Sequence, residues 1–452
     1  MSNKSDQLGQ LPIGQLLRQQ AIPASIGILI LSIYGIVDTI FVGRWIDSLA
    51  IGAVTVVLPI QFFIASIGMA IGIGGASIIS RALGSGQRQK ALSAFGNQIT
   101  LTVSLAVTVV IGGYFFLEPI LRAFGGQGKV LEYAIIYFRI LLLGIPFLAF
   151  AMMANNVMRA EGSPKFAMMC MVIPAITNMV LDPIFIVWLD MGMAGAGWAT
   201  TASFWASAAF ALWYFLSGRS EMNIPLSQLW PKWEIVSEIF AIGGVTLARQ
   251  GTIALLAIVL NNSLVRYGGE ISISVFGIIS RVLMFANFPV LGITQGFLPI
   301  AGFNHGAQKW ERVKSVIRTS ILWGSGIALG IFVVIMLLAG SVVGIFTTDA
   351  ELIERTRPAL IICFLATPLL SIQLIGSAYY QAIGRALPAL LLTLSKQGFF
   401  LIPLLFILPR FYDLNGIWMA FPIADVLAAT VTFVYLKKGM KELRQKEFVS
   451  PV

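Results

Sequence analysis

Residues 75–95, GASIISRALGSGQRQKALSAF, have a counterpart at residues 296–316, GFLPIAGFNHGAQKWERVKSV, at an offset of 221 positions. A second match has nearly the same offset, 222 positions, and joins RAEGSPKFA around Gly162 to QAIGRALPA around Gly384. Two matches at one offset indicate an internal duplication of the chain. The two halves should therefore contain the same number of structural elements in the same order.

The composition indicates that lipid surrounds most of this chain. Of its 452 residues, 58% are hydrophobic and 11% are charged, and the mean hydropathy is +0.88. Soluble domains are about 45–50% apolar and about 25% charged, so one soluble core cannot bury this much apolar surface. The composition thus excludes soluble enzymes, secreted disulfide scaffolds and disordered chains. The apolar runs are continuous rather than alternating, which excludes a transmembrane β-barrel.

The apolar runs divide into twelve segments, each long enough to cross a membrane with some tilt. Their expected bounds are 15–43, 51–80, 91–118, 130–158, 166–188 and 194–217, then 235–262, 271–301, 313–345, 357–382, 386–409 and 415–436. We therefore predict an all-α polytopic membrane protein with 12 transmembrane helices in two six-helix repeats. Because six is even, the repeats run in parallel about an axis along the membrane normal, as in many secondary transporters.

The repeat predicts three parts: an N-terminal six-helix lobe at 1–218, a cytoplasmic linker at 219–234 and a C-terminal six-helix lobe at 235–452. The linker contains Pro225 and Pro231. It suits a hinge or a passive tether equally well.

The placement of basic residues predicts the orientation. The two termini and every second connection hold 19 of the 30 Lys and Arg residues, whereas the opposite side holds 7. Cytoplasmic loops carry an excess of Lys and Arg, so we expect a multi-pass protein of the cytoplasmic (inner) membrane with both termini cytoplasmic. The first 20 residues lack an apolar core and a cleavage site, so no cleavable signal peptide is expected.

Three acidic residues fall well inside the expected spans: Asp38, Asp182 and Asp425. A charge at the bilayer centre costs about 2.5–3.5 kcal/mol on insertion scales, which makes such residues functional candidates. Asp38 lies six residues before Arg44, and Asp182 lies eight before Asp190. At 1.5 Å per residue, both are about 9–12 Å from the outer boundary, so they can share one site.

The neighbours of the first two acids are polar on the same helix face. Tyr34 precedes Asp38 by four residues, and Asn178 stands in the same relation to Asp182. Pro183 removes a backbone donor and loosens the helix beside Asp182. Two carboxylates, an amide and a phenol can hold a proton or a small hard cation, with Na⁺ possible at Asp38, Asn178 and Asp182. The alternative is structural: Asp182 caps a bent helix and Asp38 bonds a neighbouring backbone.

The second half carries different ionisable residues. Lys396 and Asp425 both fall near mid-span in adjacent segments, which favours an ion pair or a substrate contact about equally. Arg249 and Arg281 are further candidates for substrate contacts, whereas Arg139 is expected to snorkel outward or to pair with Glu132. Coupling chemistry is therefore predicted in the first half.

Other residue types exclude several kinds of chemistry. The single histidine, His305, lies in a polar loop, and Cys170 and Cys363 lie in apolar runs without neighbours at metal-ligand spacing. No phosphate-binding GxxxxGK[ST] motif is present, so ATP-driven transport is unsupported. We expect neither an enzyme nor a cofactor. The methionines at Met152–Met153 and Met168–Met171 suit a promiscuous apolar cavity or ordinary membrane core.

Four segments resemble a known family. They are IVDTIFVGR (Ile36–Arg44), RAEGSPK (Arg159–Lys165), NMVLDPIFI (Asn178–Ile186) and GAGWAT (Gly195–Thr200). Together they are similar to the multidrug and toxic compound extrusion (MATE) family, and most to its prokaryotic DinF-like branch. The resemblance covers essentially the whole chain. It implies a V-shaped pair of six-helix lobes and drug efflux by antiport with H⁺ or Na⁺.

The resemblance also implies a set of site residues in the N-terminal lobe. Carried over position by position, the cation site falls on Tyr34, Asp38, Asn178, Asp182 and Thr200, with Asn155 or Asn156 of the fourth span. Pro23 matches the proline at which the first span bends. The acidic second-lobe site of another branch has no match in this sequence.

The sequence therefore predicts a secondary active exporter of amphipathic, cationic drugs, coupled to H⁺ or Na⁺. One alternative is a flippase for lipids or lipid-linked precursors, in which Arg249, Arg281 and Lys396 line a groove for an anionic headgroup. An integral-membrane transferase is disfavoured, because no catalytic cluster lies at a membrane face. Expected partners are small amphipathic substrates and membrane lipid, with no nucleic acid, and the expected state is a monomer.

Overall fold

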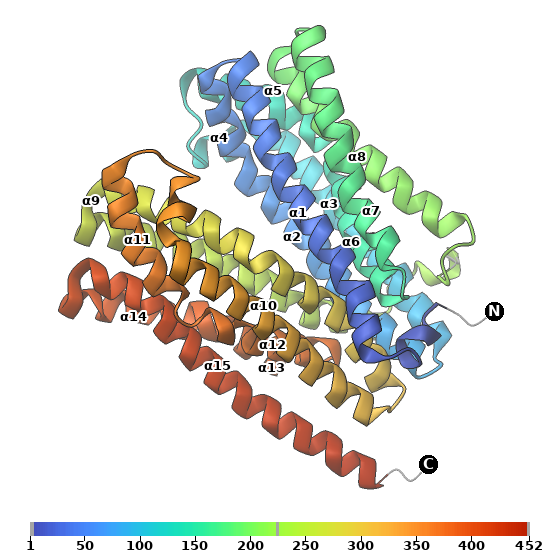
Figure 1. The fold of residues 1–452 in the computed structure, drawn as a ribbon. Coiled ribbons are helices and arrows are strands. Elements are labelled where there is room, and N and C mark those ends of the chain that lie inside the picture. Colours follow the sequence, from blue (N-terminus) through green and yellow to red (C-terminus); the bar gives the residue numbers. More distant parts are fainter. Residues whose placement is uncertain (1–3, 223–225, 450–452) are drawn as a thin grey trace. The chain divides into compact units, whose positions relative to one another are not determined.

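The computed structural model describes residues 4–222 and 226–449, and within these ranges every regular element is a helix (Figure 1). The first half contains η1 (Asp6–Gly9), α1 (Ile13–Trp45), α2 (Ser48–Gly84), α3 (Arg88–Phe115), α4 (Leu117–Ala123), α5 (Gly128–Leu142), α6 (Ile145–Ala160), α7 (Pro164–Asp182), η2 (Pro183–Trp188) and α8 (Gly192–Leu216). The second half contains η3 (Leu226–Gln228), α9 (Trp233–Gly306), α10 (Trp310–Gly344), α11 (Ala350–Phe364), η4 (Thr367–Leu369), α12 (Leu370–Ala382), α13 (Ala386–Leu394), η5 (Ser395–Leu401), α14 (Ile402–Ile407) and α15 (Pro409–Val449).

All twelve expected spans fall on these helices. In the described chain, nine helices are long and apolar enough to cross a membrane, or ten when α5 and α6, bent by 55°, count as one span. The long helix α9 contains two expected spans, which meet at Gly269 with a φ of 69°. The remaining span is α8, in which Gly, Ser, Thr and Trp lower the hydropathy of 25 helical residues. The all-α, 12-helix prediction is confirmed.

The chain forms two compact units, and each contains one segment from the other half of the sequence. Unit 1 comprises the described residues of 1–10 and 26–246, and unit 2 comprises 11–25 and those of 247–452. The first part of α1 therefore belongs to unit 2, whereas the first part of α9 belongs to unit 1. The expected division at 219–234 follows the sequence repeat, and the described residues of this linker, 219–222 and 226–234, lie within unit 1.

The linker is held against α3 by side chains of that helix. Asn97 donates through Nδ2 to the backbone oxygen of Trp230 (3.3 Å), and its Oδ1 accepts from the backbone N–H of Lys232 (2.6 Å). Thr100 donates to the backbone oxygen of Leu229 (2.6 Å). A Cβ atom at Gly96 would come within 2.2 Å of the linker backbone. These side chains replace water as partners for linker backbone groups, so residues 229–232 are fixed on unit 1.

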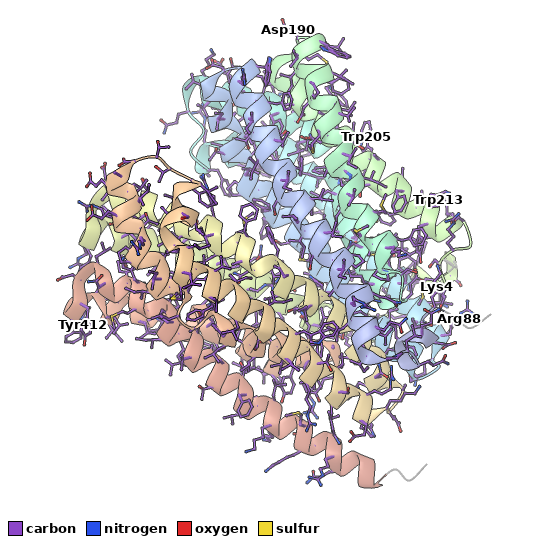
Figure 2. The ribbon with its side chains drawn as sticks, viewed as in Figure 1. Lys4, Arg88, Asp190, Trp205, Trp213 and Tyr412 are labelled. Carbon is purple, nitrogen blue, oxygen red and sulfur yellow. The ribbon has the colours of Figure 1, made fainter. Side chains whose placement is uncertain are left out.

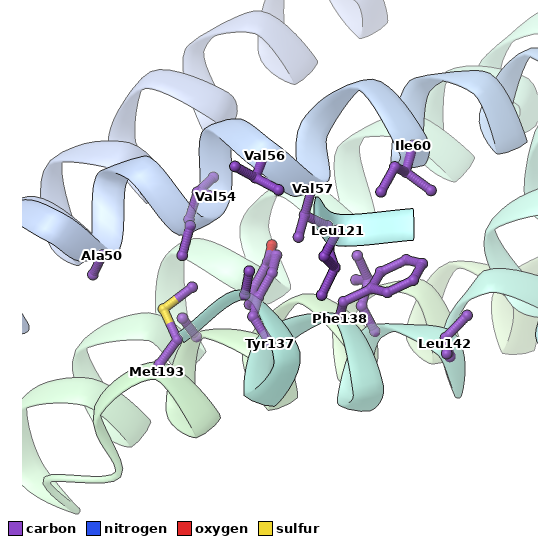
Figure 3. Close-up of a cluster of buried hydrophobic side chains, with 14 of the residues drawn as sticks. Ala50, Val54, Val56, Val57, Ile60, Leu121, Tyr137, Phe138, Leu142 and Met193 are labelled. Atoms are coloured by element: carbon purple, nitrogen blue, oxygen red, sulfur yellow. The ribbon is translucent and has the colours of Figure 1, made fainter. Parts of the chain in front are cut away.

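Unit 1 contains two clusters of buried apolar side chains, and unit 2 contains a third. Figure 3 shows part of the first cluster, in which Val54 and Val57 of α2 pack with Phe138 and Leu142 of α5. Met153 and Met158 lie fully buried in the second cluster, so these two methionines are core rather than cavity lining.

Small residues allow the helices to approach closely. A Cβ atom at Gly68 of α2 would lie 2.8 Å from the backbone oxygen of Ala149 on α6, and Gly72 meets the same helix at Met153. Within unit 2, Gly292 and Gly296 of α9 pack in the same way against the first part of α1. Close helix packing of this kind is typical of membrane bundles.

Replacing Gly68 with Val should separate α2 from α6 and lower the stability of unit 1. Overpacking of a close contact costs about 1–3 kcal/mol, so we expect a lower thermal midpoint in detergent. Gly112→Val is the control, because a Cβ atom at Gly112 of α3 meets nothing within 4 Å. Equal midpoints for the two variants would contradict the close-packing account.

Candidate ion-coupling site

The two first-half acids are positioned by different helices of unit 1. Asp38 lies in the second part of α1 and is 7% exposed. Asp182 is the last residue of α7 and is fully buried. Pro183 follows it and cannot donate a backbone hydrogen bond, and the helix widens at this point into the π-helix η2. The expected loosening of the helix beside Asp182 is therefore present.

A chain of polar contacts connects α7 to α8 and α5. The amide nitrogen of Asn178 lies 3.3 Å from Oδ1 of Asp182 and 3.3 Å from Oγ1 of Thr200, and donates to both. The hydroxyl groups of Thr200 and Tyr137 are 3.5 Å apart. Asn178 and Thr200 are fully buried. Three helices thus hold these side chains in one polar cluster within an apolar interior.

Asp38 joins this cluster from α1. Its carboxyl group interacts with that of Asp182 and with Asn178, and the phenol of Tyr34, half-buried one turn earlier, lies in electrostatic range of both acids. Oδ1 of Asp38, Oδ2 of Asp182 and Oδ1 of Asn178 are buried without a hydrogen-bond partner. Three unpartnered acceptor oxygens in one place form a site that a proton or a small cation would complete.

Two adjacent buried carboxylates cannot both remain ionised without a counter-charge, because the interior neither hydrates nor screens them. The cluster can therefore exchange charge: it is stable with a proton or cation bound, and strained when both acids are ionised. The oxygens present fit either ion, since two carboxylates, an amide and a hydroxyl are hard ligands.

The structure does not bring Asn155 or Asn156 to this cluster. Asn155 donates to the backbone oxygen of Ala167, near the start of α7, and Asn156 donates to that of Met152 (2.9 Å). Ala167 precedes Asn178 by eleven residues, which is about 16 Å along a helix. The bend between α5 and α6 changes the direction of the fourth span, and Tyr137 of α5 reaches the cluster instead.

Tyr137 is the member of the cluster that sequence reasoning missed. A tyrosine in an apolar run has no feature that distinguishes it from ordinary core, and Tyr137 also packs in the apolar cluster of Figure 3. Pro23 lies inside α1, which continues from Ile13 to Trp45. It belongs to the part of α1 in unit 2.

In unit 2, the predicted partners Lys396 and Asp425 form an ion pair of 2.5 Å. Lys396 lies in the π-helix η5, and Asp425 is buried in α15. Arg281 is exposed, whereas Arg249 is half-buried and has no ion pair or hydrogen bond among the described residues. The ion pair balances the charges of Lys396 and Asp425 without an external ion.

Another buried acid, Glu161, lies outside the spans, in the loop between α6 and α7. The carboxylate of Glu161 accepts hydrogen bonds from the hydroxyl of Tyr214, from Ser220 (2.7 Å) and from the backbone N–H of Glu221 (3.0 Å). The carboxylate of Glu221 in turn accepts from the backbone N–H (2.9 Å) and the hydroxyl (2.6 Å) of Ser5. Glu161 therefore joins this loop, the end of α8 and the N-terminal segment.

The Glu161 network lies far from the Asp38–Asp182 cluster. Figure 2 labels Lys4, the neighbour of Ser5, at the opposite end of unit 1 from Asp190, which follows η2. The motif RAEGSPK contains Glu161, but the sequence does not show which segments bond to it.

Burial raises the pKa of the Glu161 carboxyl from 4.5 to about 7, although its hydrogen bonds act in the opposite direction. Between these values the folded protein holds a proton that the unfolded chain releases. The contribution of Glu161 to stability is therefore present at acidic pH and lost as the pH rises through 7.

We expect the difference in thermal midpoint, wild type minus Glu161→Gln, to decrease as the pH is raised from 5 to 8. Both proteins contain all the other titratable groups, so the contributions of those groups cancel in this difference. Glu118→Gln is the control, because the Glu118 side chain is half-exposed and pairs with Arg122. A difference between wild type and Glu161→Gln that does not change with pH would show that Glu161 stays ionised when folded.

Two repeats of apolar helices, with a buried acidic cluster inside one unit, define a multi-pass membrane transporter. The family model described as MatE matches residues 23–184 and 250–407. The chain therefore belongs to the MatE family, which is a family of transporters and not of enzymes.

Curated relatives and solved structures agree with this assignment. The chain is 28% identical over 440 residues to the multidrug export protein MepA of Staphylococcus aureus (strain MSSA476), covering 97% of each chain. It is 26% identical to a MATE protein solved in the bent conformation, with a TM-score of 0.93 and 99% of each chain covered. It is also 26% identical to a multidrug resistance MATE family transporter solved in an outward-facing conformation, with a TM-score of 0.92 and coverages of 98% and 100%. The fold and the class, a MATE multidrug efflux transporter, are thus established.

Proposed function

We propose that this transporter exports amphipathic, cationic drugs in exchange for H⁺ or Na⁺, which binds between Asp38 and Asp182. The observation that carries the proposal is the convergence of three buried, unpartnered oxygens from Asp38, Asp182 and Asn178. The names of the curated relatives support drug export as the direction of transport.

The coupling follows from charge. With both acids ionised, the cluster favours any bound cation, and uptake of one H⁺ or Na⁺ removes one of its two negative charges. Drug and cation must then lower each other's affinity, and by linkage the effect is reciprocal. Asp38 lies on α1, whose first part belongs to unit 2, so a change in its charge acts on a helix that both units share.

The remaining expectations belong to the same proposal. The protein resides in the cytoplasmic (inner) membrane with both termini cytoplasmic, because 19 of its 30 basic residues lie on that side. It acts as a monomer, without a cofactor, and its partners are small amphipathic substrates and lipid.

The experiment uses purified protein in detergent at low buffering, to which a cationic dye is added while the pH is recorded. We expect proton release from the wild type and its loss in Asp38→Asn, because the amide cannot give up a proton. Asp190→Asn is the matched control: Asp190 is exposed, and its positive φ of 48° suits asparagine.

Displacement of the dye by Na⁺ without proton release would assign sodium as the coupling ion at the same residues. Undiminished release from Asp38→Asn would contradict the proposed site. If neither ion competes with the dye, the flippase alternative replaces drug export.

A further inference from the structure

A buried arginine at the end of α6 lacks a counter-charge. Arg159 is 4% exposed and lies in the last turn of α6. Its Nε donates to Oδ1 of Asn155 (3.1 Å), and its Nη2 lies 3.7 Å from the sulfur of Met171. Its Nη1 is buried without a hydrogen-bond partner. One edge of the guanidinium group is therefore unsatisfied.

The acid closest in sequence is already engaged. Both carboxylate oxygens of Glu161 accept hydrogen bonds from Tyr214, Ser220 and the backbone of Glu221. Within the described chain, Arg159 forms no ion pair; its hydrogen-bond partners are an amide and a thioether, and the neutral thiol of Cys170 lies in electrostatic range. The carbonyl groups at the end of α6 supply only a partial negative charge. An unpaired buried cation is energetically unfavourable, so binding of an anion here would stabilise the protein.

The side chain that covers Arg159 can move. Met171 is half-buried, and a methionine side chain is unbranched and flexible. Met168, one turn earlier on α7 and also half-buried, extends this apolar surface. Displacing Met171 would expose the guanidinium group beside an apolar strip. A ligand that fits carries an anionic head and a hydrocarbon tail.

We propose that Arg159 binds the carboxylate or phosphate group of an amphiphile at this end of unit 1. Bidentate hydrogen bonds to the guanidinium group would use the free Nη1 and the Nη2 that faces Met171. The site is distinct from the Asp38–Asp182 cluster, because Asn155 ties it to Ala167 at the start of α7. It has the opposite charge preference, and its test does not depend on the coupling ion.

The test measures binding of dodecanoate to the purified full chain in a neutral detergent at pH 8, with dodecanol as the uncharged probe. We expect the wild type to bind dodecanoate and not dodecanol, and Arg159→Gln to bind dodecanoate at least tenfold more weakly. Arg139→Gln is the matched control, because Arg139 is an exposed arginine of the same unit. Equal binding by wild type and Arg159→Gln would overturn the proposal, as would equal binding of the two probes by the wild type.

Native mass spectrometry distinguishes the two sources of the anionic group. Phosphatidylglycerol retained by the wild type in preference to phosphatidylcholine, and lost in Arg159→Gln, assigns the site to a membrane lipid. Binding of dodecanoate alone assigns it to a free anionic amphiphile.

Two further variants keep the test decisive if Arg159→Gln does not fold. Arg159→Lys keeps the positive charge but loses the paired N–H donors of the guanidinium group, so we expect weaker but measurable binding. Met171→Ala uncovers the guanidinium group and should bind dodecanoate at least as tightly as the wild type. Loss of binding in Met171→Ala with an unchanged thermal midpoint would show that the ligand contacts the methionine rather than Arg159.

Discussion

Two carboxyl groups held side by side in an apolar interior impose the constraint on which the structure depends. Asp38 and Asp182 come from different helices, and both are buried. The charge of two ionised carboxyl groups is uncompensated here, and the proposed function assigns a proton or cation to balance it. Asn178 and Thr200 hold the geometry, so binding changes charge rather than rebuilding the site.

The division of the chain connects the helix that carries Asp38 to both units. The first part of α1 belongs to unit 2, and the part that carries Asp38 belongs to unit 1. The linker that follows α8 is fixed on α3, and the first part of α9 continues in unit 1. Two of the three places where the chain passes between the units, at 25–26 and 246–247, therefore lie inside the helices α1 and α9. Under the proposed function, an ion bound at Asp38 would act on α1, one of these two helices.

Local sequence predicted the features that depend on hydropathy and on counting along a helix. The twelve spans follow from apolar length, and the equal depth of Asp38 and Asp182 follows from their distances to the loops. Pairing of Lys396 with Asp425 was one of two possibilities, and the structure contains the pair. Pro183 also marked the place where the helix widens.

Features set by tertiary packing could not be predicted in this way. At the bend between α5 and α6, Tyr137 reaches the cluster, whereas Asn155 and Asn156 lie away from it. The sequence of the span predicts neither the angle of this bend nor its direction. The partners of Glu161 come from segments more than fifty residues away in sequence. The isolation of Arg159 depends on those partners, because they occupy the nearest acid.

The most direct test of the central claim is a double-mutant cycle on the affinity of the coupling ion. The affinities of wild type, Asp38→Asn, Asp182→Asn and the double variant would be measured by calorimetry across pH and Na⁺ concentration. If the two acids share one ion, each single variant loses most of the affinity and the double variant loses little more. Losses that add independently would show two separate sites, and would contradict the account.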